Sequence, residues 1–128
     1  MKSDDGAMAL AMSAAMAIVA ILSIAVASLG GLYAARAQAT NAADAAALAA
    51  AVSTYPPASP AQPVTAAREA AESNGAVVVS CTCARDSSLD SRTVQVVTAI
   101  EVDVPVFGPI VVRAASRAEF DPILWLGR

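Results

Sequence analysis

Histidine is absent from the 128-residue chain, which removes the commonest general base, the commonest metal ligand and the usual pH switch. The two cysteines could supply only half of a zinc site. We find no phosphate-binding loop and no nucleophile beside a base. The sequence therefore predicts no catalytic residue, no metal and no cofactor, and we do not expect an enzyme.

Aromatic and charged residues are also scarce. Aromatics make up 4% of the chain and charged residues 15%, and the formal net charge of −3 gives no electrostatic basis for binding nucleic acid. Hydrophobic residues nevertheless reach 57%, so the apolar content is mostly alanine and valine. Such small side chains bury little area each, but their surfaces suit close packing between helices in a membrane.

What the chain does contain is a long uncharged run, over residues 6–35. Within it, residues 8–29 are apolar except for Ser13, Ser23 and Ser28, and about 20 apolar residues cross a hydrocarbon core of roughly 30 Å. Eight of these 22 residues are Leu, Ile or Val, which together favour insertion by about 2–5 kcal/mol. The sequence therefore predicts one membrane-spanning helix.

The N-terminal segment admits three interpretations. The first is a cleaved secretory signal with an Ala-Val-Ala site at residues 25–27, but the apolar stretch is long for an h-region of roughly 7–15 residues. The second is an uncleaved anchor. The third is a prepilin-type leader, residues 1–6, which ends in Gly6 and is cut before Ala7. The second and third stay open.

The orientation of the chain in the membrane is predicted from the lengths of its two flanks more than from their charges. Lys2 on one flank and Arg36 on the other nearly balance, so the positive-inside rule gives little direction. A six-residue leader offers nothing to translocate, whereas the C-terminal part has the pattern of a folded domain. We therefore expect a single-pass protein of the cell membrane with a cytoplasmic N-terminus and an extracytoplasmic C-terminal domain.

An alanine-rich stretch continues the helix beyond the lipid, because alanine is the best helix former. We assign residues 7–55 to one transmembrane and extended helix. Leu48, Val52 and Tyr55 lie at i, i+4 and i+7, which predicts a narrow apolar stripe on its second half.

Several residues of this helix are candidates for packing against other copies. Polar side chains three residues apart form either a solvated face or a device that sets the register between copies. The paired glycines lie where the helix leaves the lipid, as a flexible point or a close-packing site. Two alanines one turn apart complete the set, and we expect leucine at both to disrupt oligomers while leaving the sheet domain folded. The candidate packing residues are Gly30, Gly31, Asn41, Asp44, Ala46 and Ala50.

The second half of the chain predicts a small α+β domain. A proline-rich linker, residues 56–63, ends the long helix, and the domain covers residues 64–128. Its first element is a short helix that starts with Thr65 as its cap and ends with Gly75 just beyond it. Because Val64, Ala67 and the alanines that follow form its apolar side, it should lie on another element.

Three segments then alternate with a period of two, at residues 76–83, 93–106 and 109–120. This pattern predicts half-buried antiparallel strands, with the last two forming a hairpin. We expect a three-stranded sheet with the short helix on its apolar face, because this is the smallest stable arrangement.

Cys81 and Cys83 are predicted on one face of the first strand, about 7 Å apart if the strand is fully extended. Disulfides prefer a Cα separation of about 5.5–6 Å, so we favour two small buried hydrophobic residues. A disulfide within or between chains is the alternative, because the domain should face an oxidising compartment.

Three features together carry a family resemblance. They are the Gly-ended leader before the apolar helix, the runs Arg36-Ala-Gln-Ala and Asn41-Ala-Ala-Asp-Ala-Ala-Ala-Leu-Ala-Ala-Ala51, and a helix that restarts at Ala67-Arg-Glu-Ala-Ala. In these features the chain resembles TadE/TadG-type minor pilin-like proteins of tight-adherence (Flp-type) pilus and secretion loci, of the short actinobacterial type. The resemblance implies a pilin-like fold and partnership with pilin-like subunits and secretion-platform proteins.

The chain departs from type IV pilins at one position. Those proteins usually carry glutamate five residues after the cleavage point, where this chain has Ala11. A lipid-buried glutamate costs energy unless it is paired, so alanine suits a component that stays in the membrane. Two function classes therefore remain: a structural pilin-like membrane component, and a membrane-tethered extracytoplasmic binding module unrelated to a filament.

The apolar run generates a direct test of anchoring. We expect Ile21→Arg to release the chain from membranes in alkaline carbonate, because arginine at a helix centre costs about 3 kcal/mol and offsets most of the insertion energy. The parent chain should stay in the pellet. Release of the intact parent chain would contradict a membrane-spanning helix.

Overall fold

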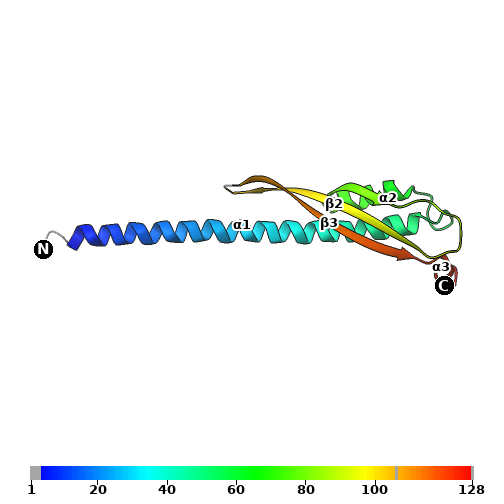
Figure 1. Cartoon of the computed structure of the whole chain (residues 1–128), viewed down its shortest axis with the longest axis horizontal. Helices are drawn as coiled ribbons and strands as arrows, with labels where there is room; N and C mark the ends of the chain where they lie inside the picture. Colours follow the sequence, from blue (N-terminus) through cyan, green and yellow to red (C-terminus); the bar gives the residue numbers. More distant parts are fainter. Residues whose placement is uncertain (1–3, 106, 128) are drawn as a thin grey trace.

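The computed structural model describes residues 4–105 and 107–127, and Figure 1 shows its elongated shape. One helix, α1 (Asp4–Ser53), runs through most of its length. At 1.5 Å per residue, these 50 residues extend for about 75 Å. Met1 to Ser3 of the expected leader lie outside the described residues, and the helix already includes the rest of that leader.

The first half of α1 stands apart from the remainder of the molecule (Figure 1). This helix is long and apolar enough to cross a membrane, and none of its most apolar window is buried against the rest of the chain. It ends at Ser53 because Pro56 and Pro57 follow within one turn and cannot continue the backbone hydrogen bonds.

A short second helix, α2 (Pro63–Ser73), packs against the second half of α1. Its cap is Gln62 and not Thr65, because Pro63 occupies the first turn, where proline's missing N–H costs nothing. Gly75 adopts a φ of +72° just past the helix end, as predicted. The Gln38 amide of α1 donates a 3.0 Å hydrogen bond to the carbonyl of Asn74 beside this turn, tying it to α1.

Three strands, β1 (Val77–Thr82), β2 (Arg92–Val104) and β3 (Gly108–Phe120), form an antiparallel sheet in that order. This confirms the α+β class, with a long apolar N-terminal helix and a three-stranded antiparallel sheet. The β2–β3 hairpin is paired without interruption from Arg92 with Phe120 to Val104 with Gly108. Val106, expected in the second strand, lies outside the described residues. A last short helix, α3 (Pro122–Leu126), follows β3 and was not predicted.

The helix that covers the sheet is α1, which contacts β2 and β3, whereas α2 contacts α1 and β1. The sequence predicts the short helix in that place, and this prediction is wrong. Of the predicted apolar stripe, Tyr55 is buried in the core, whereas Leu48 and Val52 are 63% and 40% exposed. The buried face is made of alanines that are fully excluded from solvent: Ala39, Ala42, Ala43, Ala46, Ala47 and Ala50.

A buried hydrogen bond fixes the helix along the sheet. The Thr98 hydroxyl of β2 donates to the backbone carbonyl of Ala39, at 2.9 Å, and both residues are completely buried. On the face of β2 that packs against α1, Thr98 carries the only fully buried hydroxyl, and this bond provides its hydrogen-bond partner. It therefore sets the register between α1 and β2.

A β-bulge changes which side chains of β1 face the core. Val78 pairs with Thr98 and Ser80 with Val97, so Val79 has no partner of its own. The expected inward face holds for Cys81 and Cys83, but Val77 and Val79 point outward and Val78 packs inward. A bulged residue shifts the alternation by one, and no regular period-two pattern reveals it in advance.

The buried alanine face generates a stability prediction. We expect Ala46→Leu to lower the free energy of unfolding by about 1–3 kcal/mol, because the added atoms overfill a closed helix–sheet contact. Ala37→Leu is the matched control, since this exposed alanine of the same helix should change stability by less than about 0.5 kcal/mol. Denaturant unfolding of the full chain in detergent, followed through Trp125 fluorescence, measures both. Equal midpoints would contradict the packing.

Candidate interaction surfaces

The residues expected to pack against other copies fall into two groups. Asn41, Asp44, Gly30 and Gly31 are exposed on α1, and a Cβ added at either glycine would meet nothing within 4 Å. The helix continues without a break through both glycines, so they form no hinge in this structure (Figure 1). These four positions are open to a partner.

Ala46 and Ala50 are in the other group, and here the expectation is corrected. Both are 0% exposed, and they belong to the core that α1 forms with β2 and β3. Leucine at these sites would disturb the domain itself and would not report on contacts between copies. Alanine is so abundant in this helix that its spacing alone did not distinguish the inner face from the outer one.

The outer face of α1 carries a continuous row of small or polar residues. Its members are all exposed, and their spacing alternates between four and three residues, which keeps them on one side of the helix. The row passes from the apolar half of α1 to the half that supports the sheet. Its members are Ser23, Ala27, Gly30, Ala34, Ala37, Asn41 and Asp44. We call this set the outer stripe. Its spacing did not reveal it in the sequence, because the buried alanines of the opposite face have the same four–three spacing.

The expected processing site lies at the start of α1. Gly6 and Ala7 are helical and exposed, and a Cβ at Gly6 would meet nothing within 4 Å. The chain around them is therefore accessible on all sides.

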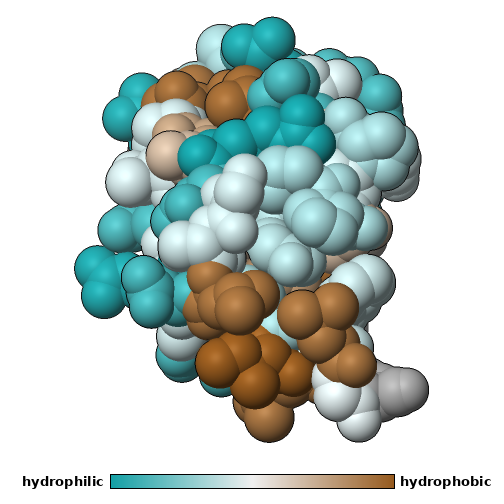
Figure 2. Space-filling view, turned by 90° about the vertical axis from the view of Figure 1, so that its right-hand side faces the viewer, coloured by the Kyte–Doolittle hydropathy of each residue, from teal (hydrophilic) through white to brown (hydrophobic). Residues whose placement is uncertain are grey.

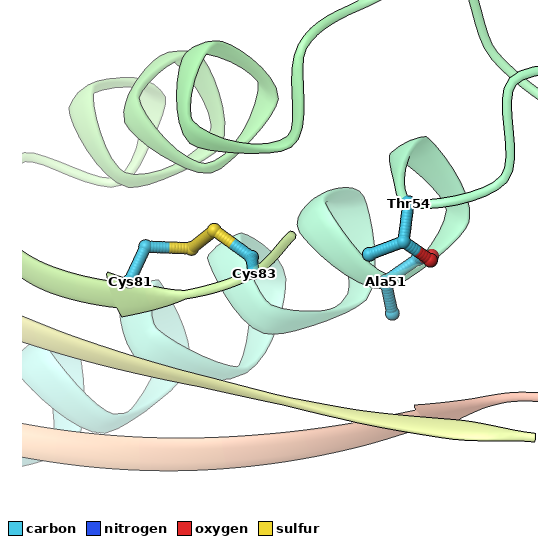
Figure 3. The surroundings of a disulfide bond; sticks show 4 residues. All are labelled: Ala51, Thr54, Cys81 and Cys83. Carbon is cyan, nitrogen blue, oxygen red and sulfur yellow. A yellow bond between two sulfur atoms is a disulfide. The ribbon is translucent and has the colours of Figure 1, made fainter. Parts of the chain in front are cut away.

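Cys81 and Cys83 are joined by a disulfide, the alternative that we had weighed second. Their Cα atoms are 5.4 Å apart, closer than in a fully extended strand, because β1 ends at Thr82 between them. Figure 3 shows the disulfide beside the last turns of α1, where Ala51 and Thr54 lie. Both cysteines are partly buried and pack against the core, so the disulfide is part of the packing of the domain.

The loop between β1 and β2 is held by Arg92. Its guanidinium donates hydrogen bonds to the carbonyls of Asp86, Ser88 and Asp90, and lies 5.8 Å from the centre of the Tyr55 ring. Hydrogen bonds from the backbone and hydroxyl of Ser88 lower the pKa of the Asp86 carboxyl, with a smaller contribution from the charge of Arg92. The hydrogen bonds that Ser88 donates to the ionised Asp86 carboxylate stabilise the loop at neutral pH, and they weaken as this carboxylate is protonated in acid.

An apolar patch lies at the end of the molecule farthest from the N-terminus, seen face-on in Figure 2. It is formed by α3, whose first turn is capped by Asp121 through hydrogen bonds from the backbone of Ile123 and Leu124. Trp125 packs edge-on against Tyr55 with ring centres 6.2 Å apart, which holds α3 against the end of α1. Leu124 is 70% exposed. The α3 patch consists of Ile123, Leu124, Trp125 and Leu126.

A second apolar surface is a groove of about 440 Å³ between α1 and the tip of the β2–β3 hairpin. Six residues of α1 form one wall, and Val104, Pro105, Phe107 and Ile110 form the other. Its one polar side chain is Ser28, whose hydroxyl donates to the carbonyl of Ile24 at 2.8 Å. No pattern in the sequence indicates this groove, because it depends on how far the hairpin reaches along α1.

Among residues 4–105 and 107–127, no group of three or more Cys, Asp or Glu side chains is placed to hold a metal ion. A comparison of the chain with family models, curated proteins and solved structures finds no match.

Proposed function

We propose that this protein is a non-enzymatic, membrane-anchored, pilin-like structural component that associates with other subunits through α1. The observation that supports this most directly is the outer stripe, which stays exposed while the opposite face of the same helix is buried by the sheet. A helix whose two faces are divided in this way can hold its own domain and a neighbouring helix at once.

The chemistry of the outer stripe suits helix association. Small side chains let two backbones approach closely, and in lipid this packing drives association because lipid tails are as apolar as leucine. The alternating spacing of four and three allows the contact to continue over several turns. Asn41 and Asp44 would favour one register, because a shifted neighbour would set apolar groups against them.

The setting that we propose is a TadE/TadG-type pilus assembly or secretion system, with other pilin-like subunits and secretion-platform proteins as partners. This rests on the run Arg36-Ala-Gln-Ala and the alanine-rich helix after it. The N-terminus would lie in the cytoplasm and the sheet domain outside it. The disulfide supports that orientation, since such bonds persist in oxidising compartments.

The test replaces two neighbouring members of the outer stripe. We expect the double variant Ala27→Leu, Gly30→Leu to lose most of the crosslinked oligomers that the parent forms in membranes. Leucine is a good helix former and is apolar, so the loss would come from the lost close approach of backbones. Both positions are exposed, so the domain itself should stay folded.

Ala14→Leu, Ala17→Leu is the matched control. These alanines are also exposed and three residues apart. They lie on the opposite side of α1 from the outer stripe, which is the side that faces the hairpin nearer the C-terminus of the helix. The control should crosslink as the parent does. If both double variants crosslink like the parent, α1 is only an anchor and the assembly proposal fails.

The second candidate function is a membrane-tethered extracytoplasmic binding module unrelated to a filament. The α3 patch favours it, because four large apolar side chains are exposed together at the end of the molecule opposite the N-terminus (Figure 2). A photo-crosslinking residue at Leu124 should then capture a different protein, whereas the same group at Ala27 should capture a second copy if α1 mediates assembly. Capture of a second copy from both positions would argue against the binding module.

A further inference from the structure

The β2–β3 hairpin reaches back along α1 toward the N-terminus (Figure 1). The Thr98–Ala39 hydrogen bond fixes the starting point of this path. Val104 lies six residues farther along β2, or about 20 Å at 3.3 Å per residue, which equals about 13 residues of helix. The tip should therefore lie beside the residues around Val26. The groove agrees, since its helix wall is Ile21, Ile24, Ala25, Ser28, Leu29 and Leu32.

This part of the hairpin carries no charge. Residues 104–112 are all uncharged, and Asp103 and Arg113 bracket them. On α1 the uncharged run likewise continues until Arg36. The fold thus brings the two charge-free segments side by side, and the charged residues of the hairpin lie on the side of the tip away from the N-terminus of α1.

The level of the bilayer along α1 can be estimated from the sequence, because the uncharged run starts at Gly6 and charged residues are costly within the hydrocarbon. About 20 residues cross the core, so a span that starts at Gly6 ends near Ala25. The groove extends from Ile21 to Leu32 and therefore straddles this boundary. A span over residues 8–29 would place the tip deeper still.

We infer that the hairpin tip is a second membrane contact, inserted at the hydrocarbon boundary of the leaflet nearer the domain, with a lipid acyl chain in the groove. Phe107 is the principal inserted side chain, because it is 76% exposed at the tip. Tyr33 is 78% exposed on α1, about one turn above the end of a span over residues 8–29, at the level where aromatic residues gather in membrane proteins. The one polar side chain that lines the groove, Ser28, is already hydrogen-bonded, so an acyl chain there would leave no polar side chain without a partner.

Lipid is a better occupant than a second copy for a geometric reason. The groove lies on the side of α1 that faces the hairpin, whereas the outer stripe lies on the opposite side. A neighbouring helix on the outer stripe would leave the groove facing the bilayer. The inference needs the anchoring part of the proposed function but is independent of assembly.

Tryptophan fluorescence in vesicles tests the contact. The full chain carrying Phe107→Trp and Trp125→Phe is reconstituted in phosphatidylethanolamine and phosphatidylglycerol vesicles, with and without bromine on the acyl chains. We expect brominated lipid to quench most of the emission at position 107. The native chain, whose one tryptophan is Trp125 on α3, should keep its emission, because α3 lies at the far end of the molecule (Figure 1).

A third protein separates failure of this inference from failure of anchoring. Leu22→Trp in the Trp125→Phe background places the probe within the apolar half of α1, and its emission should be quenched strongly. If Leu22→Trp is quenched and Phe107→Trp is not, the hairpin tip does not enter the membrane. A blue-shifted but unquenched Phe107→Trp would assign the tip to a protein neighbour and also overturn the inference. If Leu22→Trp escapes quenching, anchoring itself fails.

Discussion

The contact between the alanine face of α1 and the β2–β3 hairpin is the interaction on which the rest of the structure depends. The helix can lie close to the sheet only because the residues between them are alanines, with Thr98 supplying a single buried hydrogen bond. The closeness compensates for the small area that each alanine buries, since interiors gain from dense packing as well as from large side chains. The turn after α2 attaches to the same helix through Gln38, and Tyr55, just beyond the end of this helix, packs against Phe120 of β3.

The two halves of α1 differ in their surroundings, and this constrains the residues on each of its faces. Its first half is long and apolar enough to cross a membrane, and none of its most apolar window is buried against the rest of the chain. Its second half is divided, with alanine toward the sheet and the outer stripe toward solvent or a partner. Because one continuous backbone carries both halves, the domain has no core that is independent of the anchor.

The strands were predictable because one buried face imposes a period of two, and Val94, Val96 and Thr98 show it without interruption. The role of α1 was not predictable in the same way. Alanine occurs on every side of it, so no contrast between faces marked Ala46 as buried or Ala37 as exposed. Likewise, Leu48 and Val52 formed the clearer apolar pattern yet remain at the surface.

The remaining differences arise from tertiary geometry. The bulge at Val79 and the strand end at Thr82 bring Cys81 and Cys83 within bonding distance, and neither is visible in a regular alternation. The position of α3 depends on Tyr55 and Trp125, which lie 70 residues apart in the chain. The groove depends on how far the hairpin extends along α1, and a strand and a helix advance by different distances per residue. The bulge, the disulfide, the position of α3 and the groove therefore depend on contacts between elements and not on local sequence patterns.

The unbroken passage of α1 through Gly30 and Gly31 has a mechanical consequence. A helix without a joint acts as a lever, so under the proposed anchoring any tilt of its first half in the bilayer would be transmitted to the whole domain. The stretch from Val26 to Ser53 is about 40 Å long, and a tilt of about 20° would move its far end sideways by roughly 14 Å. The thickness of the surrounding membrane would thereby determine where the α3 patch is presented.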